Sequence, residues 1–131
     1  MNRRIAISFL YGLLLAGNCF AVDDRAIIVG SKNFTEGIVL GELIRAIAAS
    51  TGAAVVHRQA LGGTRLVFNA LVSGEIDIYA EYTGTLTHEI FAQNNPASNA
   101  ALRELLAESG LVMSEPLGFR DNFALGMREP I

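Results

Sequence analysis

The sequence predicts an α/β fold with a mostly parallel sheet flanked by helices. Short β-branched runs alternate with helical patterns along the chain, which is the order expected for strands joined by crossover helices. The first run, AIIVGS (26–31), is apolar without interruption. Such a run is typical of a parallel strand that is buried on both faces.

The first helix is predicted over 33–51. Its apolar residues recur at the spacing of one helix face; they are Leu40, Ile44, Ile47 and Ala48. Asn33 and Glu36 form a capping pattern at its start. Gly52 is expected to end it, because glycine stops helices readily.

The alternation continues after this helix. A second strand is expected over 53–61, where AAVVHRQAL is rich in β-branched residues. A short helix over 64–74 follows and is closed by Gly74. The run IDIYA (76–80) is the third predicted strand.

The last part of the chain contains a second clear helix. A helical turn is predicted to begin near Thr85, and NAALRELLAESG predicts a helix over 99–110. Two further strands are expected, at LVM (111–113) and FALGM (123–127). The chain has no internal repeat, so these elements are expected to form one domain.

Residues 1–21 have the pattern of a secretory signal peptide. Two arginines precede an apolar run over 5–17. These 13 residues are too few to span a bilayer comfortably but fit the apolar core of a signal peptide. Small residues predict cleavage after Ala21. A lipid anchor is not expected, because Asn18 precedes Cys19 where a lipobox has a small residue.

The composition of 22–131 excludes several classes of function. This part keeps 13 acidic residues and 8 of the 10 basic ones, so its formal charge is −5. A negative chain without a basic cluster does not suit nucleic acid. No cysteine remains for a disulfide or a thiol site, and no later stretch is apolar enough for a membrane span. About 110 residues suffice for one compact domain.

Three segments that follow predicted strands are expected to meet at one edge of the sheet. They are 31–33, 61–64 and 81–85. In open α/β sheets, ligands bind beyond the carboxyl ends of the strands. Tyr82 therefore belongs to a candidate site, whereas Tyr79 lies within the predicted strand and is expected to pack the sheet.

Lys32 lies between a strand and the N-terminus of a helix, where backbone N–H groups favour an anion. Its ammonium can add a charge-assisted hydrogen bond to a carboxylate or phosphate. A solvated loop lysine is the simpler interpretation. The loop LGGT (61–64) either lets backbone approach a ligand or makes a tight turn before a helix capped by Thr64.

Tyr82 and Phe123 both lie at predicted sheet edges. Aromatic faces attract cations, and several rings around a quaternary ammonium form a cage. Thr85 can offer a hydroxyl to the other end of a zwitterion. An ordinary core position for Phe123 remains an equal alternative.

No pattern in the sequence favours an enzyme, a metal or a cofactor. HEIFA (88–92) begins like the zinc motif H-E-x-x-H but lacks the second histidine. His57 has no nearby ligand partner, and Ser31 has no histidine at a readable spacing. Several carboxylates are interpreted as solvated or capping groups; they are Asp77, Glu81 and Glu89.

Four motifs occur in order along the chain: VGSKNFTEGIVLGELI (29–44), LGGT (61–64), GEIDIYAEYTGT (74–85) and EPLGFRDNFALGM (115–127). Together they resemble the substrate-binding proteins of ABC importers for glycine betaine, choline and related quaternary-ammonium osmolytes. The resemblance implies a type II periplasmic-binding fold, in which two α/β lobes close on the ligand. It also implies a monomer outside the cytoplasm that meets an ABC permease in the membrane.

The resemblance further implies a set of ligand contacts. Lys32 and Thr85 are implied as contacts to a carboxylate, and Tyr82 and Phe123 as walls of the cage. Many relatives have tyrosine where Phe123 stands; phenylalanine keeps the aromatic face but loses the hydroxyl. Asp121 is implied to face the ammonium through its backbone carbonyl.

Members of this family carry a second lobe, which supplies further aromatic residues and an arginine. By this resemblance, residues 22–131 are expected to correspond to the N-terminal lobe of an incomplete domain, with the second lobe missing. One lobe cannot enclose a small ligand, and we therefore expect the chain as written to bind weakly or not at all. The alternatives are a lobe that contacts only a partner or permease, and a secreted enzyme that uses the Lys32 loop as an anion cradle.

Overall fold

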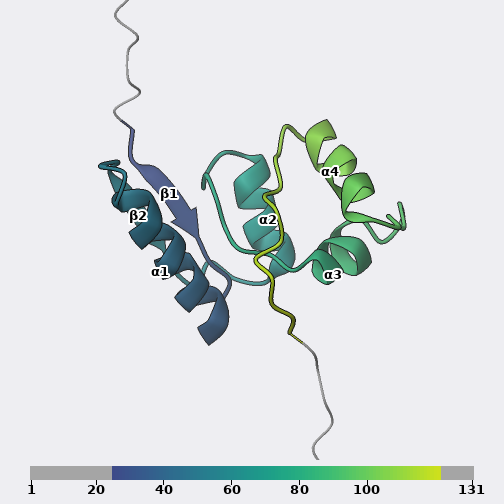
Figure 1. The fold of residues 1–131 in the computed structure, drawn as a ribbon, viewed down its shortest axis with the longest axis horizontal. Coiled ribbons are helices and arrows are strands. Elements are labelled where there is room, and N and C mark those ends of the chain that lie inside the picture. The colour runs from purple at the N-terminus through teal and green to yellow at the C-terminus, as the bar shows by residue number, and fades with distance from the viewer. Residues whose placement is uncertain (1–24, 122–131) are drawn as a thin grey trace, which may run out of the picture.

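The computed structural model describes residues 25–121 (Figure 1). The predicted signal peptide, Phe123 and the predicted strand 123–127 lie outside these residues. The elements are β1 (Ile27–Gly30), α1 (Thr35–Ala49), β2 (Val55–Arg58), α2 (Thr64–Val72), α3 (Thr83–Thr85), the π-helical turn η1 (Leu86–Ile90) and α4 (Asn99–Glu108). None of the helices described is long and apolar enough to cross a membrane.

The described sheet is parallel, as the sequence predicts. β1 and β2 pair in parallel with Ile27 opposite Val55, and α1 is the crossover between them. On the other side of β1, Ile78 forms a parallel bridge with Val29. β1 therefore lies between two neighbours, and Val29 is completely buried.

The strand predicted over 76–80 is reduced to this single bridge. The N–H of Asp77 donates to the carbonyl of Ile28 at 2.7 Å, and the N–H of Gly30 donates to the carbonyl of Ile78 at 2.8 Å. The N–H of Ile28, however, is bound by the carboxylate of Asp77 at 2.7 Å. The side chain thus takes the donor that a backbone carbonyl would use, which shortens the ladder.

The predicted helices are confirmed, and each begins and ends within two residues of its predicted limits. The turn predicted near Thr85 is also present, as α3 followed by η1. Gly52 and Gly110 follow α1 and α4 with φ of 89° and 72°. A side chain rarely adopts this left-handed conformation, so glycine suits both ends.

The cap predicted for α1 is wrong. The N-cap residue is Phe34, and no side chain caps it. Asn33 is exposed, and the carboxylate of Glu36 accepts a hydrogen bond from the hydroxyl of Tyr82 instead of reaching back to the helix start. A contact distant in sequence has therefore replaced the local capping pair.

The cap predicted for α2 is also displaced. Its N-cap residue is Gly63, and Thr64 is the first helical residue. The hydroxyl of Thr64 lies 3.5 Å from the ammonium of Lys32 rather than over the helix N–H groups. The LGGT loop is thus a turn into α2, and its threonine faces the candidate site.

The core has two parts. In the first part, Val29 of β1, Val67 of α2 and Ile76 are at most 1% exposed. A second cluster joins η1 to α4 and consists of Leu86, Leu102 and Leu106. Together these parts hold the two halves of the described fold, which Figure 1 shows on either side of α2.

The strand predicted over 111–113 is wrong. Leu111 and Met113 pack against the second core cluster, whereas Val112 is 96% exposed. This alternation matches a strand, but the segment pairs with no strand among residues 25–121. An alternating pattern of side chains does not make a β-strand unless a neighbouring strand pairs with its backbone.

Candidate ligand-binding site

The three segments predicted to converge do meet at the carboxyl end of β1. The N–H of Leu61 donates to the carbonyl of Ser31 at 2.9 Å, and the N–H of Asn33 donates to the carbonyl of Gly62 at 3.1 Å. Lys32 reaches across to Glu81 in the third segment. Parallel strands require this arrangement, because their carboxyl ends share one edge.

Lys32 is not a solvated loop residue. It is 6% exposed, and its Nζ lies 2.5 Å from Oε1 of Glu81, with both side chains 7% exposed. The hydroxyl of Thr64 lies 3.5 Å from the same nitrogen, and the ring centroid of Phe34 lies 5.6 Å away. The anion beside Lys32 in this structure is therefore a carboxylate of the chain itself.

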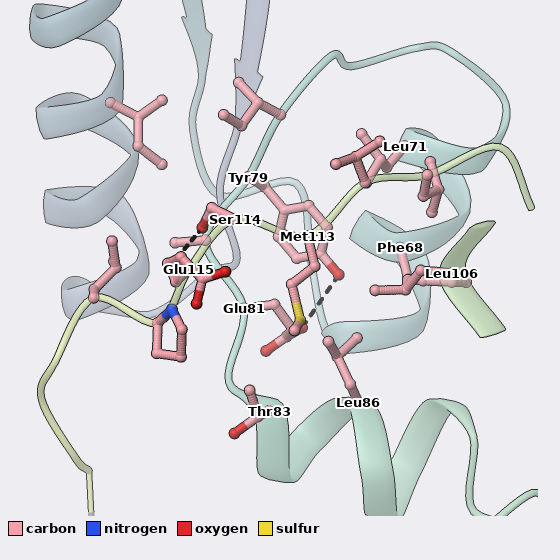
Figure 2. Close-up of a pocket in the computed structure, with 17 residues that line it drawn as sticks. Phe68, Leu71, Tyr79, Glu81, Thr83, Leu86, Leu106, Met113, Ser114 and Glu115 are labelled. Atoms are coloured by element: carbon pink, nitrogen blue, oxygen red, sulfur yellow. Dashed lines mark hydrogen bonds between the residues drawn. The ribbon is translucent and has the colours of Figure 1, made fainter. Parts of the chain in front are cut away.

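Glu81 is the centre of this network, and its interpretation as a solvated carboxylate is wrong. Oε1 also accepts from the N–H of Tyr82 at 2.8 Å. Oε2 accepts from the hydroxyl of Tyr79 at 3.3 Å, which Figure 2 marks with a dashed line. Burial raises the pKa of the Tyr79 hydroxyl, and the charge of Glu81 raises it further. Tyr79 thus remains a donor, beyond the packing role expected for it.

Tyr82 connects this network to the surface. Its hydroxyl donates to the carboxylate of Glu36, and its ring meets the ring of Phe119 with centroids 6.3 Å apart and planes at 89°. Burial raises the pKa of Tyr82, and the hydrogen bond to Glu36 and the nearby charge of Asp121 add to the effect. The phenol stays protonated and its ring is held by polar contacts at both ends.

The two rings line a small hollow of about 110 Å³. Apolar side chains of Leu40, Pro116 and Leu117 complete much of its wall. Phe119 is 50% exposed, so its ring is accessible from solvent. Sequence reasoning missed Phe119, although it stands in the same motif as Phe123 and four positions earlier.

A larger hollow of about 500 Å³ also has Glu81 in its lining (Figure 2). Its lining is mostly apolar, with Phe68, Leu71 and Leu106 from the helices and Met113 from the last described segment. Glu81 contributes to both hollows. The smaller one combines aromatic rings with nearby charge and is the better candidate for a charged ligand.

The other predicted contacts have different positions. Thr85 is the last residue of α3 and is partly buried, but Thr83, two residues earlier, lines both hollows. Asp121 is exposed at the end of the described residues. Phe123 lies outside the described residues. The structure therefore brings Lys32 and Tyr82 to one site and does not test the others directly.

A chain of polar contacts that the sequence did not reveal runs from the buried side chains of Ser31 and His57 to the exposed carboxylate of Glu42. His57 Nε2 is 3.0 Å from the hydroxyl of Ser31, and its Nδ1 is 3.2 Å from the carboxylate of Glu42. Arg45 and His57 both bond to Glu42 and lower its pKa. The N–H of Ala60 also donates to the Ser31 hydroxyl, at 3.3 Å.

This order of serine, histidine and carboxylate resembles that of a catalytic triad. Ser31 is 2% exposed, and the side chain of His57 is also 2% exposed, so no substrate reaches the hydroxyl. The contacts instead tie α1 to β2 and to the end of β1. No group of three potential metal ligands occurs within residues 25–121.

Comparisons with known proteins give a consistent family. The substrate-binding domain of ABC-type glycine betaine transport systems matches residues 25–131. The glycine betaine-binding protein YehZ of Escherichia coli is 50% identical over 56 residues, covering 43% of this chain and 18% of YehZ. The glycine-betaine-binding protein of Pseudomonas aeruginosa is 33% identical over 135 residues, covering 98% of this chain and 42% of that protein.

Two further comparisons extend this result. The ergothioneine transport permease/ergothioneine binding protein EgtU of Helicobacter pylori is 26% identical over 113 residues, covering 82% of this chain and 20% of EgtU. The solved structure of apo YehZ from Escherichia coli matches with a TM-score of 0.56 and 38% identity, over 63% of this chain and 32% of that one.

The chain spans between 18% and 42% of the lengths of the curated relatives that it matches. The structural match confirms the predicted α/β lobe of the periplasmic-binding-protein type. The family match extends from β1 through the motif that contains both Phe119 and Phe123. The chain therefore belongs to the family of substrate-binding domains of ABC-type glycine betaine transport systems.

Proposed function

We propose that this chain is the N-terminal lobe of a substrate-binding component of an ABC importer, and that its ligand is a quaternary-ammonium compound such as glycine betaine or choline. The observation that carries the proposal is the pair of rings, Tyr82 and Phe119, that lines one hollow at the carboxyl end of the sheet. Family membership and the names of the two glycine betaine-binding relatives support it.

The chemistry of the hollow suits a methylated ammonium. Each aromatic face attracts a desolvated cation by about 0.5 to 2 kcal/mol. A quaternary ammonium has no N–H to donate, so it requires no hydrogen-bond acceptor. Its methyl groups fit against the apolar side chains of Leu40 and Leu117 in the same wall.

Other side chains take supporting parts in the proposal. Phe123 adds a further wall of the cage, Thr85 donates to the opposite end of the ligand, and the backbone carbonyl of Asp121 faces the ammonium. Lys32 supports the site from within, since its ammonium holds Glu81, whose carboxylate binds the backbone N–H of Tyr82.

The proposed role is capture and delivery of the ligand without catalysis. The predicted signal peptide over 1–21 supports a location in the periplasm or otherwise outside the cytoplasm, where a monomer would meet its ABC permease. Ergothioneine belongs in a ligand panel as well, because EgtU is named for binding it.

The direct test is an NMR titration of residues 22–131 with glycine betaine and with choline, continued into the millimolar range because one lobe alone is expected to bind weakly. We expect Tyr82→Ala to weaken binding about 5- to 30-fold, the equivalent of about 1 to 2 kcal/mol for one lost aromatic wall. Tyr82→Phe is the matched control, because it keeps the ring and removes only the bond to Glu36.

Unchanged affinity of Tyr82→Ala would contradict the proposed site. Binding of none of the ligands, together with co-purification of a membrane component, would favour the alternative of a lobe that contacts only a permease. Turnover of a phosphoester that disappears in Lys32→Ala would favour the enzyme instead.

A further inference from the structure

We propose that Glu36 is a positioning residue of the ligand site: its carboxylate holds the hydroxyl of Tyr82 and so fixes the ring that forms one wall of the smaller hollow. The inference rests on the proposed function and adds a residue to the same site. Within the part of the chain that the structure describes, Glu36 is not among the residues that line this hollow. It therefore acts on a ligand through Tyr82.

The main chain of Tyr82 is fixed by contacts of its own. Its N–H donates to Oε1 of Glu81 at 2.8 Å, and its carbonyl accepts from the N–H of Leu86 at 3.0 Å. Tyr82 is also the N-cap residue of α3 and has an extended backbone. These contacts hold the Cα in place, but the side-chain torsions can still turn the ring between rotamers.

The packing of the ring does not remove this freedom. The neighbouring ring is that of Phe119, with centroids 6.3 Å apart, and Phe119 is itself 50% exposed. Phe119 lies in the segment 111–121, which contains no helix or strand. A ring with only this neighbour would have to be ordered when a ligand binds, and such ordering lowers affinity.

Glu36 supplies a constraint at the far end of the ring. The hydroxyl of Tyr82 donates to Oε1 of Glu36, which lies 46 positions earlier in the chain. A hydrogen bond to a charged acceptor is about twice as strong as one between neutral groups. Because the hydroxyl is the outermost atom of the side chain, a bond there fixes the direction in which the ring points.

Glu36 is held by a regular element. It is partly buried in the first turn of α1, where the helix dipole favours a negative charge. Leu40 follows one turn later on the same face of α1 and lines the hollow together with Tyr82. The helix α1 thus supplies one part of the wall and orients the aromatic part.

The test is an NMR titration of residues 22–131 with glycine betaine and with choline, continued into the millimolar range. Glu36→Ala should weaken binding about two- to fivefold, because the ring then has to be ordered by the ligand. Glu36→Gln should bind nearly as well as the unmodified chain, since its amide oxygen still accepts from the phenol. Glu104→Ala is the matched control, because it removes the same charge from an exposed position on α4.

A double-mutant cycle separates positioning from the other effects of the substitution. Tyr82→Phe removes the same hydrogen bond from the other side, so it should weaken binding by a similar factor, and the double variant should be no weaker. In spectra without ligand, the ring resonances of Tyr82 and Phe119 should shift in Glu36→Ala and stay nearly in place in Glu36→Gln. Because Tyr82→Phe tests the same bond, the test does not depend on Glu36→Ala remaining folded.

Three results would overturn the positioning role and leave the proposed function standing, as long as Tyr82→Ala weakens binding. Unchanged affinity of Glu36→Ala or of Tyr82→Phe is the first. Equal losses in Glu36→Gln and Glu36→Ala would show an effect of charge alone. A double variant weaker than Tyr82→Phe would show that Glu36 acts elsewhere. Unchanged affinity of Tyr82→Ala, or no binding by the unmodified chain, would overturn both proposals.

Discussion

The buried ion pair between Lys32 and Glu81 allows a quantitative prediction. At 2.5 Å and an effective dielectric constant of about 20, the Coulomb attraction is about 6 to 7 kcal/mol before desolvation is subtracted. Removing one partner leaves the other charge buried, because each side chain is only 7% exposed. Lys32→Met should therefore lower the free energy of unfolding by about 3 to 5 kcal/mol.

The assay is urea unfolding of residues 22–131, with a double-mutant cycle. Glu81→Gln removes the charge and keeps a similar shape; its amide oxygen can accept from the N–H of Tyr82, and its NH2 group can donate to the hydroxyl oxygen of Tyr79. The double variant should be more stable than Lys32→Met alone, because it contains no unpaired charge. A cost below about 1 kcal/mol for Lys32→Met, the range of exposed pairs, would refute the reasoning.

Two further predictions concern the fold around the site. A Cβ at Gly41 would lie 2.4 Å from Nε2 of His57, so Gly41→Ala should lower the free energy of unfolding by about 1 to 3 kcal/mol. Gly84 has open space around it, so Gly84→Ala should be nearly neutral. Equal effects of the two variants in thermal or urea unfolding would contradict the packing described. The hydrogen bond from the N–H of Ile28 lowers the pKa of Asp77 below its ordinary value of 3.8. The ionised Asp77 carboxylate therefore stabilises the fold above pH 3.8, and this contribution is lost as the pH falls through the lower pKa of the folded state. Asp77→Asn should be less stable than the unmodified chain at neutral pH but lose less stability on acidification. Parallel pH profiles of stability for the two proteins would contradict this.

The pair of rings formed by Tyr82 and Phe119 lies partly in a motif that the sequence singled out, although the sequence assigned a different aromatic residue of that motif to the site. The segment EPLGFRDNFALGM was expected to supply the second ring through Phe123. The described part of the same segment places Phe119 against Tyr82. Phe123 lies outside the described residues, so its part in the cage stays a prediction beside that of Phe119.

Local patterns in the sequence were sufficient for the architecture. The apolar run of β1 and the periodicity of α1, α2 and α4 depend on neighbours a few positions away, and those elements appear within two residues of their predicted limits. Parallel pairing then forces the segments after the strands to one edge. The location of the candidate site was therefore predictable before any side chain was placed.

The partners of the polar side chains were decided only by the tertiary structure. Lys32 meets Glu81 across 49 positions, Glu36 meets Tyr82 across 46, and Ser31 meets His57 across 26. No local spacing encodes such contacts, because each depends on how separate elements pack. The capping pair predicted for α1 failed for the same reason, since the carboxylate of Glu36 has a partner that only the folded chain brings near it.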